Sequence, residues 1–218
     1  MESTLNISHL TLARDGREVI RDCSFTVAPG ELLAIVGPNG TGKSTLLQGI
    51  MGYANCERRQ GSIILGDESL EELPMHERAR RGVFLIHQEP PAIPGVTIAG
   101  AIRAQAEALR GSLSIPAIQS EIRAACARLG LDEQFSRRPL HDGLSGGEKK
   151  RAELLQMLVA KPRYVLVDEL DSGLDVAMVE VAADVIRELR TQGVGFIIVS
   201  HNPAFLHGVA PTAELRLG

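Results

Sequence analysis

Aromatic side chains and cysteine are both scarce in this 218-residue chain. Aromatic residues make up only 3% and tryptophan is absent, whereas hydrophobic residues reach 44%. We therefore expect a packed core built from leucine, isoleucine, valine and alanine. The three cysteines, Cys23, Cys56 and Cys126, form no CxxC pair. This pattern indicates reduced, mostly buried thiols in a cytoplasmic protein.

A surplus of positive charge is missing too. The formal net charge is -4 at pH 7, which argues against a nucleic-acid partner, because such surfaces need a basic field. The N-terminal stretch lacks the basic-then-apolar order of a signal peptide. No apolar run approaches the ~18 residues of a membrane span. We therefore expect no direct membrane insertion, so that any work at a membrane would need a partner protein.

Apolar strands alternate with helical segments over much of the chain. Four continuous apolar runs predict buried strands, and helical periodicity separates them. This alternation implies a mostly parallel sheet with helices on both faces. The apolar runs are 31–37, 82–86, 164–168 and 195–200, and the helical segments of this part are 43–52, 147–160 and 176–191. Shorter patterns predict strands at 5–12, 18–27 and 62–65 and a charged helix at 74–81.

A segment without strands interrupts this alternation. It starts with the loop QEPPAIPG, whose prolines exclude regular structure. Two stretches with helical periodicity follow, at 97–110 and 115–129. The expected organisation is a single domain with an α/β core and a helical insertion. The predicted boundaries are 1–87 and 145–218 for the core, and 88–144 for the insertion.

The strongest single motif is GPNGTGKST, which lies between a predicted buried strand and a helix. It fits the phosphate-loop pattern G-x-x-x-x-G-K-[ST]. Its glycines let backbone N–H groups point at phosphates, and the helix offers its positive N-terminus. Lys43 can reach the β- and γ-phosphates of ATP, and the Ser44 hydroxyl can ligate Mg²⁺. The predicted ATP-binding residues are Gly37, Pro38, Asn39, Gly40, Thr41, Gly42, Lys43, Ser44 and Thr45.

Polar side chains follow the apolar strands, where open parallel sheets place their ligands. Asp168 is expected to hold Mg²⁺, and Glu169 to polarise the attacking water or accept its proton. His201 could contact the γ-phosphate or that water, and Gln88 could ligate Mg²⁺ or water. Taken alone, each residue also fits a structural role, such as a helix cap or a solvated loop side chain. The phosphate loop upstream favours the functional interpretation.

A second anion site is predicted at the sequence LSGGE. Its serine supplies a hydroxyl, and its glycines supply backbone N–H groups at a helix N-terminus. Because the helical insertion lies between this stretch and the phosphate loop, one chain cannot easily fold both onto one nucleotide. Two chains arranged head to tail can, so we expect an ATP-dependent homodimer with two ATP molecules at its interface. Ser145, Gly146, Gly147 and Glu148 would then bind ATP in trans.

The basic run after this stretch allows two interpretations. Lys149, Lys150 and Arg151 are expected on the following helix. They could lie near the negatively charged nucleotide or in solvent, and the sequence favours neither place.

Together the motifs resemble those of ATP-binding-cassette (ABC) ATPases. GPNGTGKST, Gln88, LSGGEKKR, YVLVDE, DSGLD and His201 occur in that family's order, over essentially the whole chain. The resemblance implies an α/β P-loop fold of ABC type: a mostly parallel sheet core, an antiparallel β edge and an inserted helical subdomain. It also implies Mg²⁺-dependent ATP hydrolysis and an SGLD loop, at 172–175, that links the two active sites. Asp175 is then a further residue that would bind ATP in trans. The implied catalytic residues are Lys43, Gln88, Glu169 and His201, and the metal ligands are Ser44, Gln88 and Asp168.

A narrower likeness concerns IPGV at 93–96, SGGEKKR followed by LLQM, and DSGLD. These stretches are similar to SufC, the ATPase of the Suf iron–sulfur cluster assembly system. That likeness implies SufB- and SufD-type scaffold proteins as partners, whereas a transporter would pair with a membrane permease. Either partner would contact the helical insertion and the proline-rich loop. No aromatic residue lies near Arg14, where the family often stacks adenine, so Arg14 or Val19 is left to contact the base.

Overall fold

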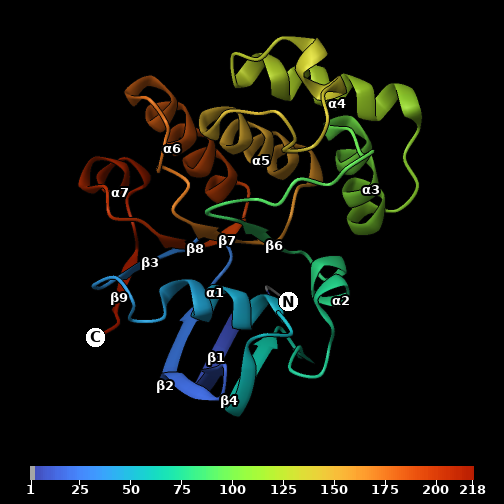
Figure 1. Cartoon of the computed structure of the whole chain (residues 1–218). Helices are drawn as coiled ribbons and strands as arrows, with labels where there is room; N and C mark the ends of the chain where they lie inside the picture. Colours follow the sequence, from blue (N-terminus) through green and yellow to red (C-terminus); the bar gives the residue numbers. More distant parts are fainter. Residues whose placement is uncertain (1–2) are drawn as a thin grey trace.

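Two β-sheets form the frame of the protein in the computed structural model, which describes residues 3–218 (Figure 1). One sheet is parallel, in the order β6-β7-β8-β3-β9, and the other is antiparallel, in the order β2-β1-β4-β5. The strands are β1 Leu5–Arg14, β2 Arg17–Val27, β3 Leu32–Val36, β4 Glu57–Leu65, β5 Glu68–Ser69, β6 Val83–Ile86, β7 Tyr164–Asp168, β8 Gly195–Val199 and β9 Ala213–Arg216.

Helices cover both faces of the parallel sheet. Those of the core are α1 Lys43–Met51, α2 Met75–Arg80, α5 Gly146–Ala160, α6 Val176–Thr191 and α7 Pro203–Val209. Within 88–144 lie α3 Ile98–Arg110, α4 Ile115–Arg128 and the 3₁₀ helix η1 Glu133–Arg137. Across residues 3–218, none of these helices has both the length and the apolar character needed to cross a membrane.

The expected α/β fold is confirmed, with two differences in the strands. The antiparallel strands form a sheet of their own rather than an edge of the parallel sheet. Strand β4 begins at Glu57, not at residue 62, and β5 was not predicted. The start of β4 is polar, and pairing with β1, such as Leu12 with Arg58, makes it a strand. A pattern based on hydrophobic residues could not find it, because its cause is a long-range partner.

The two faces of the parallel sheet contribute to different hydrophobic clusters. On one face, Leu166 joins the cluster that contains Leu46 of α1 and Leu10 of β1. On the other face, Val165 and Val167 join the cluster formed with α5 and α6. This alternation follows from the two-residue period of a strand. Helix α1 therefore lies between the two sheets (Figure 1).

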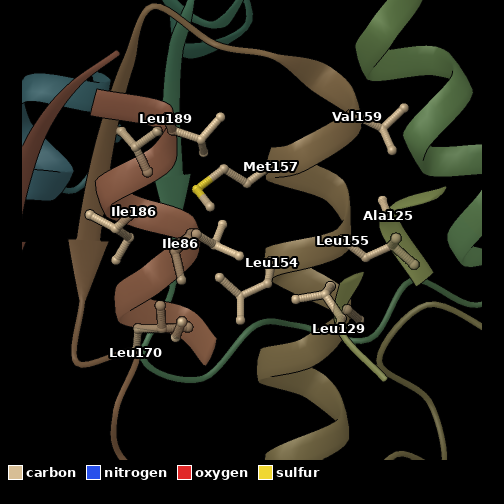
Figure 2. Close-up of a cluster of buried hydrophobic side chains, with 14 of the residues drawn as sticks. Ile86, Ala125, Leu129, Leu154, Leu155, Met157, Val159, Leu170, Ile186 and Leu189 are labelled. Carbon is tan, nitrogen blue, oxygen red and sulfur yellow. The ribbon is translucent and has the colours of Figure 1, made fainter. Parts of the chain in front are cut away.

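Helix α5 is buried between α6 and the helical insertion. In Figure 2, Leu154 and Met157 lie on the side of α5 that faces α6, while Leu155 points toward Ala125 and Leu129. All five side chains belong to one continuous hydrophobic cluster. The helical insertion is thus packed on the same helix that begins with the glycine-rich stretch.

Buried Arg78 holds the C-terminal end of α1. Its guanidinium donates hydrogen bonds to the carbonyls of Gly49, at 3.0 Å, and Ile50, at 2.8 Å. It also donates to the carbonyls of Leu73 and Glu71, each at 2.8 Å. A cation at this end of a helix interacts favourably with the helix dipole. Arg78 therefore fixes the helix whose other end meets the phosphate loop.

A buried phenol joins the two sheets. The Tyr164 hydroxyl, on β7, accepts a hydrogen bond from the backbone N–H of Leu5 on β1 at 3.2 Å. The same oxygen lies 2.9 Å from the carbonyls of Ser3 and Val27, to one of which it donates its proton. Burial raises the pKa of Tyr164 to about 12, so the phenol is neutral at every pH at which the protein would be handled.

Replacing Tyr164 with Phe is expected to lower the free energy of unfolding by about 1–3 kcal/mol, because buried backbone groups lose their partner. Urea denaturation of the two proteins measures the difference. The other tyrosine is half-exposed Tyr53, and Tyr53→Phe is a matched control with a smaller expected loss. Equal losses for the two variants would contradict a special role for Tyr164.

Candidate nucleotide site

The phosphate loop follows β3 and ends at the first residue of α1. Two of its glycines are required by their surroundings. A Cβ atom on Gly37 would lie 2.1 Å from the carbonyl oxygen of Leu217. Gly42 has a φ of 93°, and a Cβ there would lie 2.6 Å from Val19. Close packing and left-handed backbone together explain the glycines at both positions.

The Lys43 ammonium lies inside the loop. Its side chain is buried, and Nζ donates to the carbonyl oxygens of Gly37 at 2.9 Å and Pro38 at 2.8 Å. Thr41 also closes the loop, with its hydroxyl donating to Pro38 at 3.0 Å. The buried ammonium is thus bonded to carbonyl oxygens of the loop, whereas the motif predicts backbone N–H groups as the phosphate-binding groups.

Ser44 and Asp168 meet at the carboxyl end of the parallel sheet. The Ser44 hydroxyl donates to Asp168 Oδ1 at 3.0 Å. Burial raises the pKa of Asp168, and the hydrogen bond from Ser44 opposes that shift. A hydroxyl and a buried carboxylate are hard oxygen ligands, and a cation would offset the cost of burying the carboxylate's charge, so this pair fits Mg²⁺.

A cavity of about 370 Å³ opens beside this pair. Gln88 lines it, as does Arg14, which donates to Gln48 Oε1 at 3.4 Å. The structure therefore brings the three predicted metal ligands to one cavity, and places Arg14 next to them. Its lining residues are Arg14, Ser44, Gln48, Leu85, His87, Gln88, Glu89 and Asp168.

Three predicted catalytic residues also meet, at the ends of β6, β7 and β8. The Gln88 amide donates to Glu169 Oε2 at 2.6 Å, and His201 Nε2 lies 3.7 Å from Glu169 Oε1. The side-chain amide nitrogen of Gln88 thus donates to the Glu169 carboxylate, an arrangement that the sequence did not predict. Of these three residues, Gln88 lines the 370 Å³ cavity, whereas Glu169 and His201 lie next to it at the ends of β7 and β8.

Glu169 has a strained backbone. Its φ is 49°, in the left-handed region that residues other than glycine rarely adopt. Its N–H donates to the Val199 carbonyl at 3.0 Å, and its own carbonyl accepts from Ser172 at 3.2 Å. These bonds hold a conformation that costs about 1–3 kcal/mol. Strain of this kind is concentrated at functional positions, which supports Glu169 as a functional residue.

The LSGGE stretch forms the N-terminus of α5, with Ser145 as the capping residue. The Ser145 hydroxyl accepts from the Glu148 N–H at 3.3 Å and donates to Glu148 Oε2 at 2.9 Å. Glu148 Oε2 also accepts from the Ser145 N–H at 2.8 Å. The serine hydroxyl is therefore engaged within its own chain, whereas the sequence suggested a hydroxyl ready for a phosphate.

The SGLD loop lies beside this stretch. Arg151 of α5 and Asp175 are 3.5 Å apart, and a Cβ on Gly147 would lie 3.4 Å from the Gly173 carbonyl. By contrast, none of the hydrogen bonds or ion pairs within residues 3–218 joins the phosphate loop with 145–148. The head-to-tail arrangement of the two predicted anion sites stays a prediction.

Lys150 has a role that the sequence did not suggest. Its side chain is only 3% exposed, so the solvent alternative does not describe it. Nζ donates to the carbonyls of His87 at 2.7 Å and Gln88 at 2.6 Å. Burial lowers the pKa of Lys150, and the Glu153 carboxylate opposes this shift. Lys150 therefore fixes the backbone from which Gln88 reaches Glu169.

A buried carboxylate lies next to Lys150, and it too was missed. Glu153 Oε1 is 3.1 Å from His141 Nε2, and Glu153 Oε2 accepts from the His87 N–H at 3.3 Å. Burial alone would raise the pKa of Glu153, but the facing His141 and His87 rings keep it well below its ordinary value. No local pattern marks this cluster, because its members come from β6, the insertion and α5.

An apolar groove of about 450 Å³ lies above the cluster, between the α/β part and the helical insertion. Helices α2 and α3 and the proline-rich loop form its walls, and both helices lie beside β6 (Figure 1). Met75 and Ile93 in these walls are 43% and 45% exposed, unusual for large apolar side chains. Its polar lining residues include His141, Glu153 and Gln156, so the groove reaches the buried cluster.

Comparisons with known proteins agree with this geometry. A family model described as ABC transporter matches residues 20–172. A probable ABC transporter ATP-binding protein from Streptococcus pyogenes serotype M3 is 40% identical over 212 residues, which are 96% of this chain and 83% of that protein.

Two solved structures share the fold. An ATP-binding subunit of an ABC transporter has a TM-score of 0.85 at 24% identity, over 98% of this chain and 85% of its own. A dimeric ATP-binding cassette in a post-hydrolysis state, bound to ADP and Pi, has a TM-score of 0.83 at 20% identity. The match covers 98% of this chain and 94% of that one. The family match and the Streptococcus relative establish that the chain belongs to the ABC transporter family, as an ATP-binding domain that hydrolyses ATP.

Proposed function

We propose that this protein is the ATP-hydrolysing subunit of a transporter-type assembly, in which two copies close on two ATP molecules and move partner proteins docked in their grooves. The convergence of Gln88, Glu169 and His201 beside the Ser44–Asp168 pair carries the proposal. The Streptococcus relative is described as a probable ABC transporter ATP-binding protein, which favours a membrane permease as the partner.

In this mechanism the residues of one chain hold the phosphates and the attacking water. The phosphate loop and Lys43 would bind the β- and γ-phosphates. Ser44, Asp168 and Gln88 would hold Mg²⁺, which would supply positive charge to offset that of the phosphates. Glu169 accepts a proton from the attacking water, and His201 stabilises the γ-phosphate. Because Gln88 is bonded to Glu169 in the free chain, its amide must release the carboxylate before the water can be oriented.

The second copy completes the site. Ser145, Gly146, Gly147 and Glu148 would present the N-terminus of α5 to the partner's ATP, with Asp175 beside them. The ion pair between Arg151 and Asp175 supports this grouping. In this proposal 88–144 acts as a helical subdomain and 1–87 with 145–218 as the nucleotide-binding core, and the groove lies at their junction.

A second candidate is the ATPase of a Suf-type iron–sulfur cluster assembly complex, with SufB- and SufD-type scaffolds in place of a permease. Specific sub-motifs favour it: IPGV places Ile93 in the groove wall, and LLQM places Gln156 in the groove lining. In that case the protein would act in the cytoplasm rather than at the membrane surface. Both candidates share the fold, the ATPase site and the groove.

Replacing Glu169 with Gln is expected to reduce steady-state ATP hydrolysis by about 100-fold or more, because the water loses its base. The variant should still bind ATP, and its dimer should persist because hydrolysis no longer opens it. Phosphate release and light scattering with ATP measure the two effects. Glu180→Gln, an exposed site on α6, is the matched control and should retain activity. Parent-rate hydrolysis by Glu169→Gln would refute the assigned role.

Replacing Ile93 with Glu should reduce partner recovery about tenfold or more, because a carboxylate would have to be buried in the groove. The measurement is cross-linked affinity purification from native cells, with partners identified by mass spectrometry. Ile115→Glu changes a 54% exposed isoleucine outside the groove and is the control. Loss of a permease supports the transporter proposal, and loss of SufB- or SufD-type proteins supports the second candidate. Unchanged recovery of either partner would rule out docking at the groove.

A further inference from the structure

We propose that Arg138 is a positioning residue for ATP binding in trans: it holds and neutralises Glu148 so that Ser145 can turn its hydroxyl toward the other copy's nucleotide. The inference rests on the proposed function, because it presumes that the LSGGE stretch meets a phosphate. No sequence motif pointed to Arg138. It follows η1, and its guanidinium contacts Glu148 Oε1 while donating to the Gly143 carbonyl at 3.2 Å.

Arg138 is anchored through both its side chain, which is 39% exposed, and its backbone. Its guanidinium carbon lies 5.6 Å from the centre of the Phe135 ring, within the range of a cation–π contact. Its backbone carbonyl accepts from the Ile98 N–H at 3.0 Å, at the start of α3. The arginine is therefore anchored to η1 and α3, and reaches across to the N-terminus of α5.

The charge of Glu148 creates the need for such a partner. A carboxylate in the first turn of a helix interacts favourably with the helix dipole. Here, however, the same N-terminus is proposed to receive a phosphate, which a free carboxylate would repel. Hydrogen bonds from the Ser145 backbone and from Arg138 lower the pKa of Glu148 to about 2, so the carboxylate is ionised. Arg138 supplies the opposing charge.

The hydrogen bonds of Ser145 impose a second requirement. The hydroxyl can donate a single hydrogen bond, and in the free chain it donates this bond to the Glu148 carboxylate. If the hydroxyl donates its hydrogen bond to a phosphate instead, the Glu148 carboxylate loses one hydrogen-bond donor. Glu148 would then keep the Ser145 N–H and Arg138. Arg138 therefore lowers the cost of releasing the serine hydroxyl.

The test uses the full chain in the Glu169→Gln background, where the ATP-bound dimer should persist. The measured quantity is the ATP concentration that gives half-maximal dimer in light scattering. Arg138→Met should raise this concentration about tenfold, the scale expected for uncompensated like charges at an interface. Adding Glu148→Gln should restore it to within about threefold, because the repelling charge is gone. Higher salt should shrink the Arg138→Met defect through screening.

Matched variants separate charge placement from folding. Arg137→Met removes the same charge from an exposed neighbouring position and should leave dimerisation unchanged. Arg138→Lys keeps the charge but loses the forked geometry, and should give an intermediate value. If Arg138→Met does not fold, Arg138→Lys with and without Glu148→Gln decides by the same rescue criterion.

Different results would contradict the role of Arg138 and the proposed head-to-tail dimer. Parent-like dimerisation of Arg138→Met, or failure of Glu148→Gln to rescue it, would overturn the role of Arg138 alone. If the Glu169→Gln parent binds ATP without forming a dimer, the head-to-tail proposal fails, and the inference fails with it.

Discussion

The register of β6, β7 and β8 is the constraint on which the nucleotide site depends. Ile86 pairs with Val167, and Asp168 pairs with Val199, so the three strands end at nearly the same level. The residues that follow these strands are then brought together, although they are far apart in the sequence. A slip of one residue would turn the strand's side chains to the opposite face and disperse the group.

A buried polar layer lies against that sheet edge. The Lys150 ammonium donates to the backbone carbonyls of His87 and Gln88, while the Glu153 carboxylate accepts from the backbone N–H of His87. The segment that carries Gln88 is thus held by an ammonium and a carboxylate from one helix, α5. Because unpaired buried charges are costly, these groups stabilise the arrangement only as a set. His87 and Glu153 of this layer also line the groove.

Sequence patterns predicted the parts of the fold that depend on local chemistry. The phosphate loop, the buried strands and the polar residues at their ends follow from short-range rules, and the structure places Gln88, Glu169 and His201 together as expected. Two of the features that the patterns missed depend on distant partners: the polar start of β4 and buried Lys150. The same limit applies to Arg138, whose meaning emerges only beside Glu148. The carboxylate that engages Ser145 is a local feature instead, because Ser145 and Glu148 form a capping box, a pattern that is visible in the sequence.

Arg78 connects a wall of the groove to the helix that follows the phosphate loop, by hydrogen bonds that do not involve the sheet. The arginine belongs to α2, a wall of the groove, and two of its hydrogen bonds end on carbonyls of α1. A partner that displaces α2 therefore pulls on the helix that carries Lys43 and Ser44 at its opposite end. If a partner docks in the groove as proposed, its binding would therefore be coupled to nucleotide binding through α1, by a route separate from Gln88.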